Sequence, residues 1–593
     1  MEHNIEKLVS LVGNQHRYQY FIGIICFLFW FNTTMVSFSL GFLENKPLIS
    51  YYDKDNNETI VEGMSYDTCD FEKNSYTIVE TYDFSWVIDL GIECDKFKVS
   101  LIGTLASLGC LLGALTYSIF TKIFGERKVI LSCNVLFMLV LLVTIFVKNY
   151  VMYCFTCVLS MTMCNIISYS VVVLLSEIVL KSKKSVFIGC INSGLGIGGI
   201  FYVLMFIAFK NWKWVFVVCI CIAFVLEIIT YFFFIETLQG SLDKKDYEGF
   251  EKSLKFIAKF NGRLDIYNKE IIKDEYQNAL KELKHEKVQT FATPKTNPET
   301  PQINMLVFNG KPKDNEHYKE RIETEKALNS QPIQTENNVP TTPNQDPVIY
   351  NNLQTPKPLM ESPVISKQNT QEKENKEQKN EKLSPLVLLR YPSVRYTFLL
   401  FCLLWFCTSA LYSGLTIGLK SLPGSIYTNS LLLFVAETPG YFVGGVSMNS
   451  KMGRKYSLML FTGCFALMCL FMVILFNYET PSVVFYLLTR FFVMSAFCIY
   501  YTYCLESYPL SINQLAYGIN GSCNSLGGII IPFVIEYISR RLLYLIYAIL
   551  GAVCTLLMIF LKETRGKEIP DHIKEMELEA KTKELNDIPD VVV

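Results

Sequence analysis

The sequence is poor in charge and in histidine, and each shortage removes a class of function. Charged residues make up 18% of the chain, whereas soluble domains carry about a quarter. The five histidines show no metal-ligand spacing with cysteine or carboxylate, and no nucleophile stands beside a base. The basic residues are dispersed along loops rather than gathered into one patch. We therefore expect no enzyme, no metal or other cofactor, and no nucleic-acid partner.

Long apolar runs take up most of the chain instead. Hydrophobic residues make up 51% of it, and runs of about 20 mostly apolar residues, the length that crosses a bilayer, recur along it. This pattern indicates a polytopic membrane protein. It predicts twelve spans, at Tyr18–Leu40, Phe97–Phe120, Val129–Val147, Tyr150–Leu174, Val186–Phe209, Trp214–Ile235, Tyr396–Leu419, Ile426–Val446, Ser457–Phe476, Ser482–Cys504, Tyr517–Ile538 and Leu542–Leu561.

The basic residues set the orientation of these spans. A polar stretch precedes the first span without a small-residue cleavage site, so this span is expected to be retained rather than removed as a signal peptide. Residues 1–17 and the tail 563–593 then share one side, which we assign to the cytosol. Arg540 and Arg541 count against this assignment. The loop residues that favour it are Lys122, Arg127, Lys128, Lys181, Lys183, Lys184, Lys451, Arg454 and Lys455.

The first long loop, residues 43–96, is expected to be extracellular. It contains Cys69, Cys94 and the glycosylation sequon that begins at Asn57, so a disulfide and a glycan are both plausible there. The alternative is two free thiols and an unused sequon. The cysteine pair and the sequon together favour the plasma membrane over an internal membrane.

The second long loop, residues 236–392, is expected to be cytosolic and has two parts. Residues 243–286 alternate charged and apolar residues at helical spacing, as in GFEKSLKFIAKF, and predict amphipathic helices. Residues 290–382 are rich in Pro, Asn, Gln, Thr, Lys and Glu and have few aromatics, which predicts disorder. This part is either a binding segment for cytosolic regulators or an inert tether.

An internal repeat relates the two halves of the chain. Gly125 in FGERK matches Gly453 in MGRK, 328 residues later and also after the second span of its half. Two further pairs keep this spacing to within one residue: Glu177 with Glu506, and Glu236-Thr237 with Glu563-Thr564. Repeats of this kind are typical of secondary transporters. We predict two six-helix bundles, at residues 18–235 and 393–562.

Several segments together resemble one family, the organic cation/anion/carnitine transporters of the major facilitator superfamily. The segments are SWVIDLGIECDK (85–96), VAETPGY (435–441), MGRKYS (452–457), ESYP (506–509) and LKETRGKEIPD (561–571). The resemblance implies an all-α membrane protein with twelve transmembrane helices in two pseudo-symmetric six-helix bundles. It also implies transport by alternating access through a central cavity.

The loop after the second span departs from this family. The superfamily has an acid and then a base around the loop glycine, and these charges latch the cytosolic helix ends. Here Lys122 stands where the acid is expected, and Glu126 where a base is expected. The pair has either exchanged signs or makes a weak latch. The resemblance assigns the gating role to Lys122, Gly125, Glu126, Arg127, Gly453, Arg454, Glu177 and Glu506.

Glu437 lies in the middle of an apolar span, two residues before Pro439. A carboxylate at this depth is costly unless it meets water or a partner, and such residues usually mark substrate or proton pathways. The proline removes a backbone hydrogen bond and favours a kink. The resemblance also places an acidic residue at the substrate cavity here. The alternative is a structural ion pair with Arg490 or Lys420.

Other residues are candidates for the same cavity. Trp405 and Tyr412 lie seven residues apart, so they share a helix face, and aromatic rings attract cations. The resemblance assigns the choice of substrate charge to the position of Ser525, which is neutral here. Asn524, Asn192 and Arg490 complete the set, although each also suits a packing role.

Two function classes remain after enzymes are set aside. The first is a secondary transporter of small organic ions, whether cations, zwitterions or anions. The second is a non-transporting membrane receptor or scaffold on the same fold, favoured if the altered loop has disabled cycling.

The orientation can be tested with epitope tags. Tags at the N-terminus and near residue 340 should bind antibody only after the cells are permeabilised, because both segments are expected to be cytosolic. Antibody staining with and without detergent measures this. Labelling of either tag on intact cells would reject the topology.

Overall fold

The structure of the protein is a computed structural model built mainly of helices. It describes residues 17–267 and 386–567, apart from gaps at 44–47, 54–57, 64–75, 82–85, 93–94, 244–245, 420–421, 423–425 and 510–511, and also Ile573 and Met576. One compact unit contains all of these residues.

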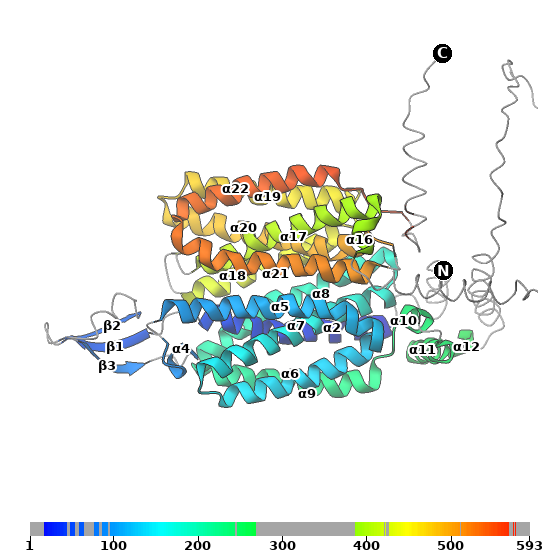
Figure 1. Ribbon diagram of the computed structural model, residues 1–593, viewed down its shortest axis with the longest axis horizontal. Helices are drawn as coiled ribbons and strands as arrows, with labels where there is room; N and C mark the ends of the chain where they lie inside the picture. The colour runs from blue at the N-terminus through cyan, green and yellow to red at the C-terminus, as the bar shows by residue number, and fades with distance from the viewer. Residues whose placement is uncertain are drawn as a thin grey trace, which may run out of the picture. The chain divides into compact units, whose positions relative to one another are not determined.

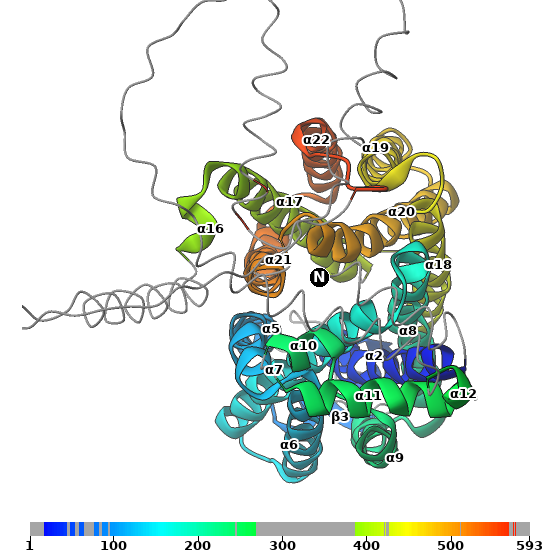
Figure 2. The same cartoon turned by 90° about the vertical axis from the view of Figure 1, so that its right-hand side faces the viewer.

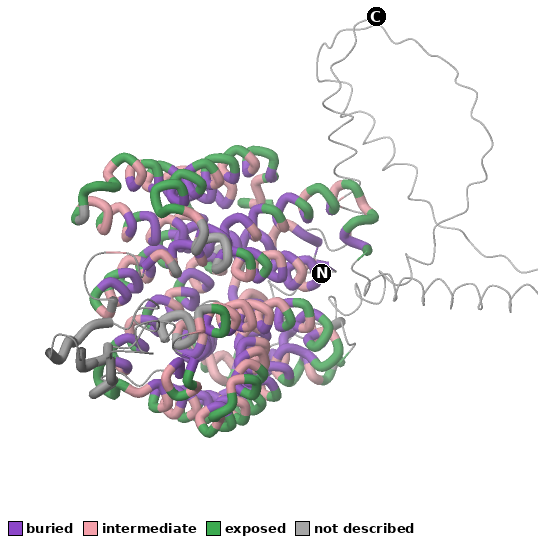
Figure 3. The backbone as a smooth tube through the Cα atoms, turned by 60° about the vertical axis from the view of Figure 1, so that its left-hand side comes forward, coloured by how far each residue is buried: buried purple, intermediate pink, exposed green. Residues whose placement is uncertain are grey.

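The N-terminal half is a bundle of six long helices. Within it α7 packs on α5, α6 and α2, and α2 packs on α8 and α9 (Figure 2). Buried residues line the interior of the molecule, and exposed apolar residues lie on its outer faces (Figure 3). The helices are α2 (Arg17–Leu43), α5 (Lys96–Phe124), α6 (Glu126–Phe146), α7 (Tyr150–Ile178), α8 (Lys181–Phe209) and α9 (Trp212–Phe233).

Asparagine side chains begin two of these helices. Asn149 Oδ1 accepts a hydrogen bond from Val151 N at 2.8 Å at the start of α7. Asn211 Oδ1 accepts one from Lys213 N at 3.0 Å at the start of α9. Each side chain satisfies a backbone N–H that has no partner within its helix. The two asparagines therefore mark where the chain turns back into the bundle.

The C-terminal half repeats the arrangement. In it α20 packs on α18 and α19, α22 packs on α19, and α17 packs on α21. The helices are α17 (Pro392–Gly418), α18 (Ile426–Ser447), α19 (Gly453–Ile474), α20 (Glu479–Glu506), α21 (Asn513–Tyr537) and α22 (Arg540–Leu557), the last followed by the 3-10 turn η2 (Met558–Phe560).

Ten of the twelve long helices in the described parts of the chain are apolar enough to cross a membrane. The other two are α18 and α21, which carry Glu437 and Asn520 in their interiors. Both are long and pack inside the helix assembly. The predicted fold of twelve helices in two bundles is confirmed. Some helices extend past their apolar runs: α8 begins at Lys181 rather than Val186.

Glycines bring the two halves together along two helix pairs. On α8, a Cβ added at Gly189 would lie 2.9 Å from Gly445 Cα, and one added at Gly196 would lie 3.1 Å from Thr438 Cα, both on α18. Between α5 and α21, a Cβ at Gly518 would lie 2.9 Å from Ala114 O. Such close backbone approach requires small residues. The α8–α18 and α5–α21 pairs are therefore the contacts that hold the halves against each other.

A small sheet, which the sequence did not predict, lies at one end of the helices (Figure 1). Its strands are β1 (Leu48–Asp53), β2 (Glu58–Gly63) and β3 (Tyr76–Thr81), antiparallel in the order β2-β1-β3. The following turn, α4 (Trp86–Asp89), anchors to the N-terminal half. The Trp86 ring stacks on Tyr153 at 5.5 Å, and Trp212 Nε1 donates to Asp89 Oδ2 at 3.0 Å.

Three short helices follow α9 at the opposite end of the bundle (Figure 1). They are α10 (Leu238–Asp243), the amphipathic α11 (Tyr247–Phe260) and α12 (Leu264–Tyr267). Phe256 and Phe260 of α11 pack on Tyr18 of α2, and Asn261 Oδ1 accepts from Tyr18 N at 2.9 Å. A further short helix, α16 (Val387–Arg390), precedes α17. The rest of 243–286 and all of 290–382 lie outside the described residues.

The glycine contacts predict which substitutions separate the halves. Gly189→Val should destabilise the protein by about 1–3 kcal/mol, because the added carbons meet backbone atoms of α18 that cannot move aside. Thermal unfolding of purified protein in detergent measures the effect.

The matched control is Gly463→Ala on α19, where an added Cβ would meet nothing closer than 3.7 Å. This control should be neutral or stabilising, since alanine favours a helix over glycine. Equal effects of the two variants would contradict the proposed contact.

Candidate functional site

A buried ion pair joins two helices of the C-terminal half. Arg490 Nη2 on α20 donates to Glu437 Oε1 on α18, and both side chains are fully buried. Of the two partners considered from the sequence, Arg490 is the one paired with Glu437, and Lys420 lies outside the described residues. Pro439 lies inside α18 two residues after Glu437 and removes one backbone donor.

The Arg490 guanidinium also holds α17. Its Nη1 donates to Tyr412 O and to Thr416 Oγ1, each at 3.0 Å. The guanidinium carbon lies 4.3 Å from the centre of the Tyr412 ring, which is a cation–π contact. A single side chain therefore ties three helices of the C-terminal half together.

The pair is not fully saturated with hydrogen bonds. Glu437 Oε2 and Arg490 Nε are buried and have no hydrogen-bond partner among the described residues. A buried ion pair repays its desolvation only when its remaining donors and acceptors are satisfied. The pair therefore keeps one free acceptor and one free donor, enough to bind an additional polar or charged group.

Aromatic rings run from this pair to the other half of the molecule. Tyr412 and Trp405 both contact Phe497, with ring centres 5.5 and 6.0 Å apart. Trp405 then contacts Tyr501 at 5.2 Å, and Tyr501 contacts Trp30 of α2 at 5.8 Å. These rings form a continuous path from Arg490 to the N-terminal half.

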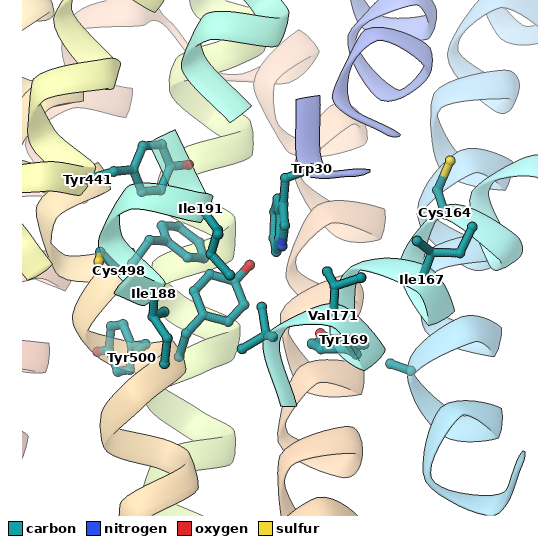
Figure 4. Close-up of a cluster of buried hydrophobic side chains, with 14 of the residues drawn as sticks. Trp30, Cys164, Ile167, Tyr169, Val171, Ile188, Ile191, Tyr441, Cys498 and Tyr500 are labelled. Atoms are coloured by element: carbon teal, nitrogen blue, oxygen red, sulfur yellow. The ribbon is translucent and has the colours of Figure 1, made fainter. Parts of the chain in front are cut away.

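A second set of rings crosses between the halves beside it. Tyr501 contacts Tyr517 at 6.4 Å, and Tyr517 of α21 meets Tyr169 of α7 edge-on at 5.0 Å. Figure 4 shows Trp30 and Tyr169 of the N-terminal half in one buried cluster with Tyr441 and Tyr500 of the C-terminal half. Aromatic side chains from both halves therefore pack together in the buried centre of the molecule.

The polar residues predicted for the cavity lie on other helices than the Glu437–Arg490 pair. Asn192 on α8 is fully buried, and the thiol of Cys498 on α20 is its polar neighbour in the other half. On α21 the buried Ser525 hydroxyl donates to Gly521 O of its own helix at 3.5 Å. Asn524 is half-buried, and its Oδ1 has no partner among the described residues. No described contact joins Asn524 or Ser525 to the Glu437–Arg490 pair.

The loop after α18 carries a dense charge network. Arg454 donates to Glu506 through Nε at 2.9 Å and Nη2 at 3.1 Å. Glu563 accepts from the backbone nitrogens of Arg454 and Lys455, each at 2.9 Å. Gly453 has φ +76°, and a Cβ there would lie 2.7 Å from the Glu563 carboxylate, so only glycine fits.

The loop after α5 also contains a glycine with positive φ, but it carries another charge. Gly125 again has positive φ, and Arg127 Nη2 donates to Tyr231 O at 2.7 Å, just as Lys455 Nζ donates to Ile559 O at 2.5 Å. Tyr231 and Ile559 keep the 328-residue spacing of the repeat.

In this loop the buried Glu126 occupies the position that Arg454 has in the other half of the repeat. Its Oε1 accepts a long hydrogen bond from Tyr117 at 3.3 Å, while its Oε2 has no partner among the described residues. Lys122 is half-exposed at the end of α5 and has a partner. On α7, Glu177 Oε1 accepts from Gln514 Nε2 of α21 at 3.4 Å, a contact between the halves.

The predicted disulfide and glycosylation site fall outside the described residues. Cys69, Cys94 and Asn57 are not among the described residues. The cysteines that are described are free thiols, most of them buried in helices. Among the described residues no three His, Cys, Asp or Glu side chains are arranged to hold a metal ion.

Sequence reasoning missed the aromatic partners from the other helices. Trp30, Tyr501 and Tyr517 meet across the two halves, yet aromatics make up 14% of the chain. With so many rings present, nothing in the sequence distinguished these three from the rest. The capping role of Glu563 was also missed, although its place in the repeat was a usable signal.

Comparisons with known proteins agree with this architecture. The profile of the family described as "Major Facilitator Superfamily" matches residues 20–532. In solved structures, the proton:xylose symporter XylE bound to 6-bromo-6-deoxy-D-glucose is similar in fold, with a TM-score of 0.54 at 12% identity over 98% of each chain. The partially occluded inward-open form of XylE from E. coli has a TM-score of 0.50 at 11% identity over 95% of this chain and 100% of that one.

Two curated relatives match part of the chain. Solute carrier family 22 member 21 of Mus musculus is 29% identical over 207 residues, which are 33% of this chain and 35% of that protein. Organic cation/carnitine transporter 2 of Rattus norvegicus is 30% identical over 200 residues, 32% of this chain and 34% of that protein. The match therefore spans about a third of the length of these relatives.

The buried pair predicts a stability defect that a second substitution relieves. Glu437→Gln should cost about 3–5 kcal/mol, because it leaves the Arg490 charge buried and unpaired. Adding Arg490→Met removes that charge and should recover more than half of the loss. Thermal unfolding of the purified variants in detergent measures both steps.

The control is Glu227→Gln on α9, a half-buried carboxylate that accepts from Asn134 Nδ2 at 2.9 Å and has no basic partner among the described residues. It should change stability by less than about 1 kcal/mol, since an amide oxygen accepts the same bond. A double variant less stable than Glu437→Gln alone would show that the pair does not neutralise Arg490 as inferred.

Proposed function

Since the chain belongs to the major facilitator superfamily, we propose that it is a secondary transporter that moves small organic ions across a membrane by alternating access. The observation that carries this proposal is the buried Glu437–Arg490 pair with its free acceptor and free donor. Ionisable groups at this depth in a membrane usually serve a transport pathway. Organic cation/carnitine transporter 2, one of the partial relatives, is named for solutes of this class.

The pair suits a charged organic solute for electrostatic reasons. A cationic group can bind at Glu437 Oε2, and an anionic or polar group can bind at Arg490 Nε. The rings of Tyr412, Trp405 and Tyr501 offer apolar surface and cation–π contacts to the rest of the solute. In this proposal Glu437 and Arg490 are substrate-binding residues, and Asn192, Asn524 and Ser525 are further polar candidates.

The contacts between the halves suit alternating access. They are made by small residues along α8–α18 and α5–α21, and by ring contacts such as Phe38 with Phe434. Among the described residues the Gln514–Glu177 hydrogen bond joins α21 to α7, whereas the close approaches at Gly189 and Gly518 are backbone contacts without a charged group. Packed apolar surfaces of this kind can rotate against each other without leaving charges unpaired.

A membrane receptor or scaffold without transport is the second candidate. The observation that favours it is Glu126, which stands where the other half has Arg454 and so alters one of the two charge networks. In both readings the protein is a multi-pass membrane protein and not an enzyme. We propose the plasma membrane as its location, and residues 290–382 as a segment for cytosolic regulators.

Uptake into proteoliposomes separates the two candidates. Purified protein should take up at least one radiolabelled solute from a set containing an organic cation, a zwitterion and an organic anion. The Glu437→Gln/Arg490→Met double variant should lower uptake per folded protein at least about tenfold, equal to the loss of about 1.4 kcal/mol of transition-state stabilisation.

Uptake by the control variant Glu227→Gln should stay within about twofold of wild type. The substitution should change the activation free energy of transport by less than about 0.5 kcal/mol. A stable double variant with unchanged uptake would make the pair purely structural. Absence of uptake for the whole solute set, with folded wild-type protein in the vesicles, would favour the receptor.

A further inference from the structure

One acid of the N-terminal half lies inside a span and borders its outer surface. Glu227 of α9 is half-buried and lies six residues before Phe233, the last residue of that helix, which is about 9 Å along the axis. Its neighbours Phe224 and Ile228 are 58% and 45% exposed, so this side of α9 meets the acyl chains. Apart from the paired Glu437, the other Asp and Glu residues in the described spans lie within four residues of a helix end.

The Glu227 side chain is held by α6. Asn134 of α6 is 1% exposed, and its Nδ2 donates to Glu227 Oε2 and to Ala223 O, each at 2.9 Å. The amide oxygen Asn134 Oδ1 is buried and has no hydrogen-bond partner among the described residues. Within the same residues no hydrogen bond reaches Glu227 Oε1. Two acceptor atoms without a donor therefore lie together at the α6–α9 contact, and such a place suits a donor group.

The described spans supply no base for this acid. Their Lys and Arg residues lie in the first or last four residues of a helix, except Arg490, which is fully buried in the other half. Arg127, at the start of α6, does contact α9, but its Nη2 donates to Tyr231 O, one turn beyond Glu227. It makes no ion pair with Glu227. The counter-charge of Glu227 must therefore come from another molecule in the membrane.

The other half has the same pair of positions without an acid. At the 328-residue spacing of the repeat, Asn134 matches Thr462 on α19 and Glu227 matches Thr555 on α22. Thr462 is also buried, and Thr555 is also half-buried. Thr555 Oγ1 donates to Gly551 O of its own helix at 2.8 Å and so needs no outside partner. The matched helices pack without an acid, so packing does not account for Glu227.

The position of α6 and α9 leaves this surface open to a neighbour. Both helices lie on the side of the N-terminal half that faces away from the C-terminal half (Figures 1 and 2). The contacts between the halves run along α8–α18 and α5–α21 instead. A molecule bound to α6 and α9 therefore leaves those contacts untouched.

We propose that the outer face of α6 and α9, centred on Asn134 and Glu227, binds a transmembrane helix of a partner protein with a lysine or arginine about two turns from its cytosolic end. The basic group pairs with the Glu227 carboxylate, and apolar side chains of the partner pack on Phe224 and Ile228. A carboxylate in hydrocarbon is costly unless a counter-charge meets it, and polar contacts between helices stabilise their association there. A second copy of this chain does not fit, because its described spans present no exposed base at this depth.

This inference holds whether or not the protein transports a solute. The uptake and unfolding experiments above use purified protein, which contains no partner helix. Glu227→Gln therefore remains a neutral control in them.

Association with defined transmembrane peptides tests the proposal. Two labelled leucine-rich peptides of about 22 residues, one with a single lysine about two turns from its end and one with leucine there, are mixed with the full-length protein in lipid vesicles. Energy transfer to a fluorophore on the N-terminus of the protein measures their binding. The lysine peptide should bind at least about fivefold more tightly than the leucine peptide. Equal binding of the two peptides would overturn the proposal, whether Glu227 is then neutral or paired with Arg127.

Variants of Glu227 show whether its charge is what the peptide recognises. Glu227→Gln keeps an acceptor for Asn134 and removes the charge, so the preference for the lysine peptide should disappear. Glu227→Asp keeps the charge and should retain a preference of at least about twofold. The control Glu248→Gln, at an exposed acid on α11, should keep the full preference. A preference that persists in Glu227→Gln, or an equal loss in the Gln and Asp variants, would overturn the site.

Two other occupants of this face would give different results. If a second copy bound there, energy transfer between two differently labelled copies of the protein would fall in Glu227→Gln. If a membrane-dissolved amine bound there, a labelled long-chain alkylamine would bind wild type more tightly than Glu227→Gln, while the two peptides bound equally. Either result would overturn the assignment of a partner helix.

Discussion

Every charge that this fold buries must find a counter-charge or a hydrogen bond without help from bulk water. Glu437 is neutralised by Arg490 inside the C-terminal half, and Glu506 is neutralised by Arg454 at the end of that half. Leaving either carboxylate unpaired is far costlier than on a soluble surface. The placement of α17, α18 and α20 therefore depends on one guanidinium that contacts all three.

The need to pair buried charges also distinguishes contacts within the C-terminal half from contacts between the halves. Within the C-terminal half the helices are joined by charge-assisted bonds and a cation–π contact. Between the halves, glycines bring α8 close to α18 and α5 close to α21, and aromatic rings pair α2 with α18 and α7 with α21. Charged contacts depend on exact geometry, whereas packed apolar faces slide at lower cost. This difference is what a fold needs if its halves are to move as two bodies.

The repeat makes the two loop sites an internal comparison. Arg127 and Lys455 bond carbonyls at matched places, and Gly125 and Gly453 both have positive φ. Only the residue after the glycine differs in sign. The change from Arg454 to Glu126 leaves these shared contacts in place, because neither of them involves that side chain.

By itself the sequence determined the spans and the two halves, and it marked Glu437 as a carboxylate in the middle of a span. Apolar run length and a mid-span carboxylate are local features, which need no knowledge of neighbours. Only the tertiary structure decided that Glu437 pairs with Arg490, 53 residues away, and that Trp30 meets Tyr501 across the halves. It also decided that strands lie between α2 and α4. Such partners depend on which helix faces meet, and in a chain this rich in apolar and aromatic residues many faces are equally plausible until the helices are packed.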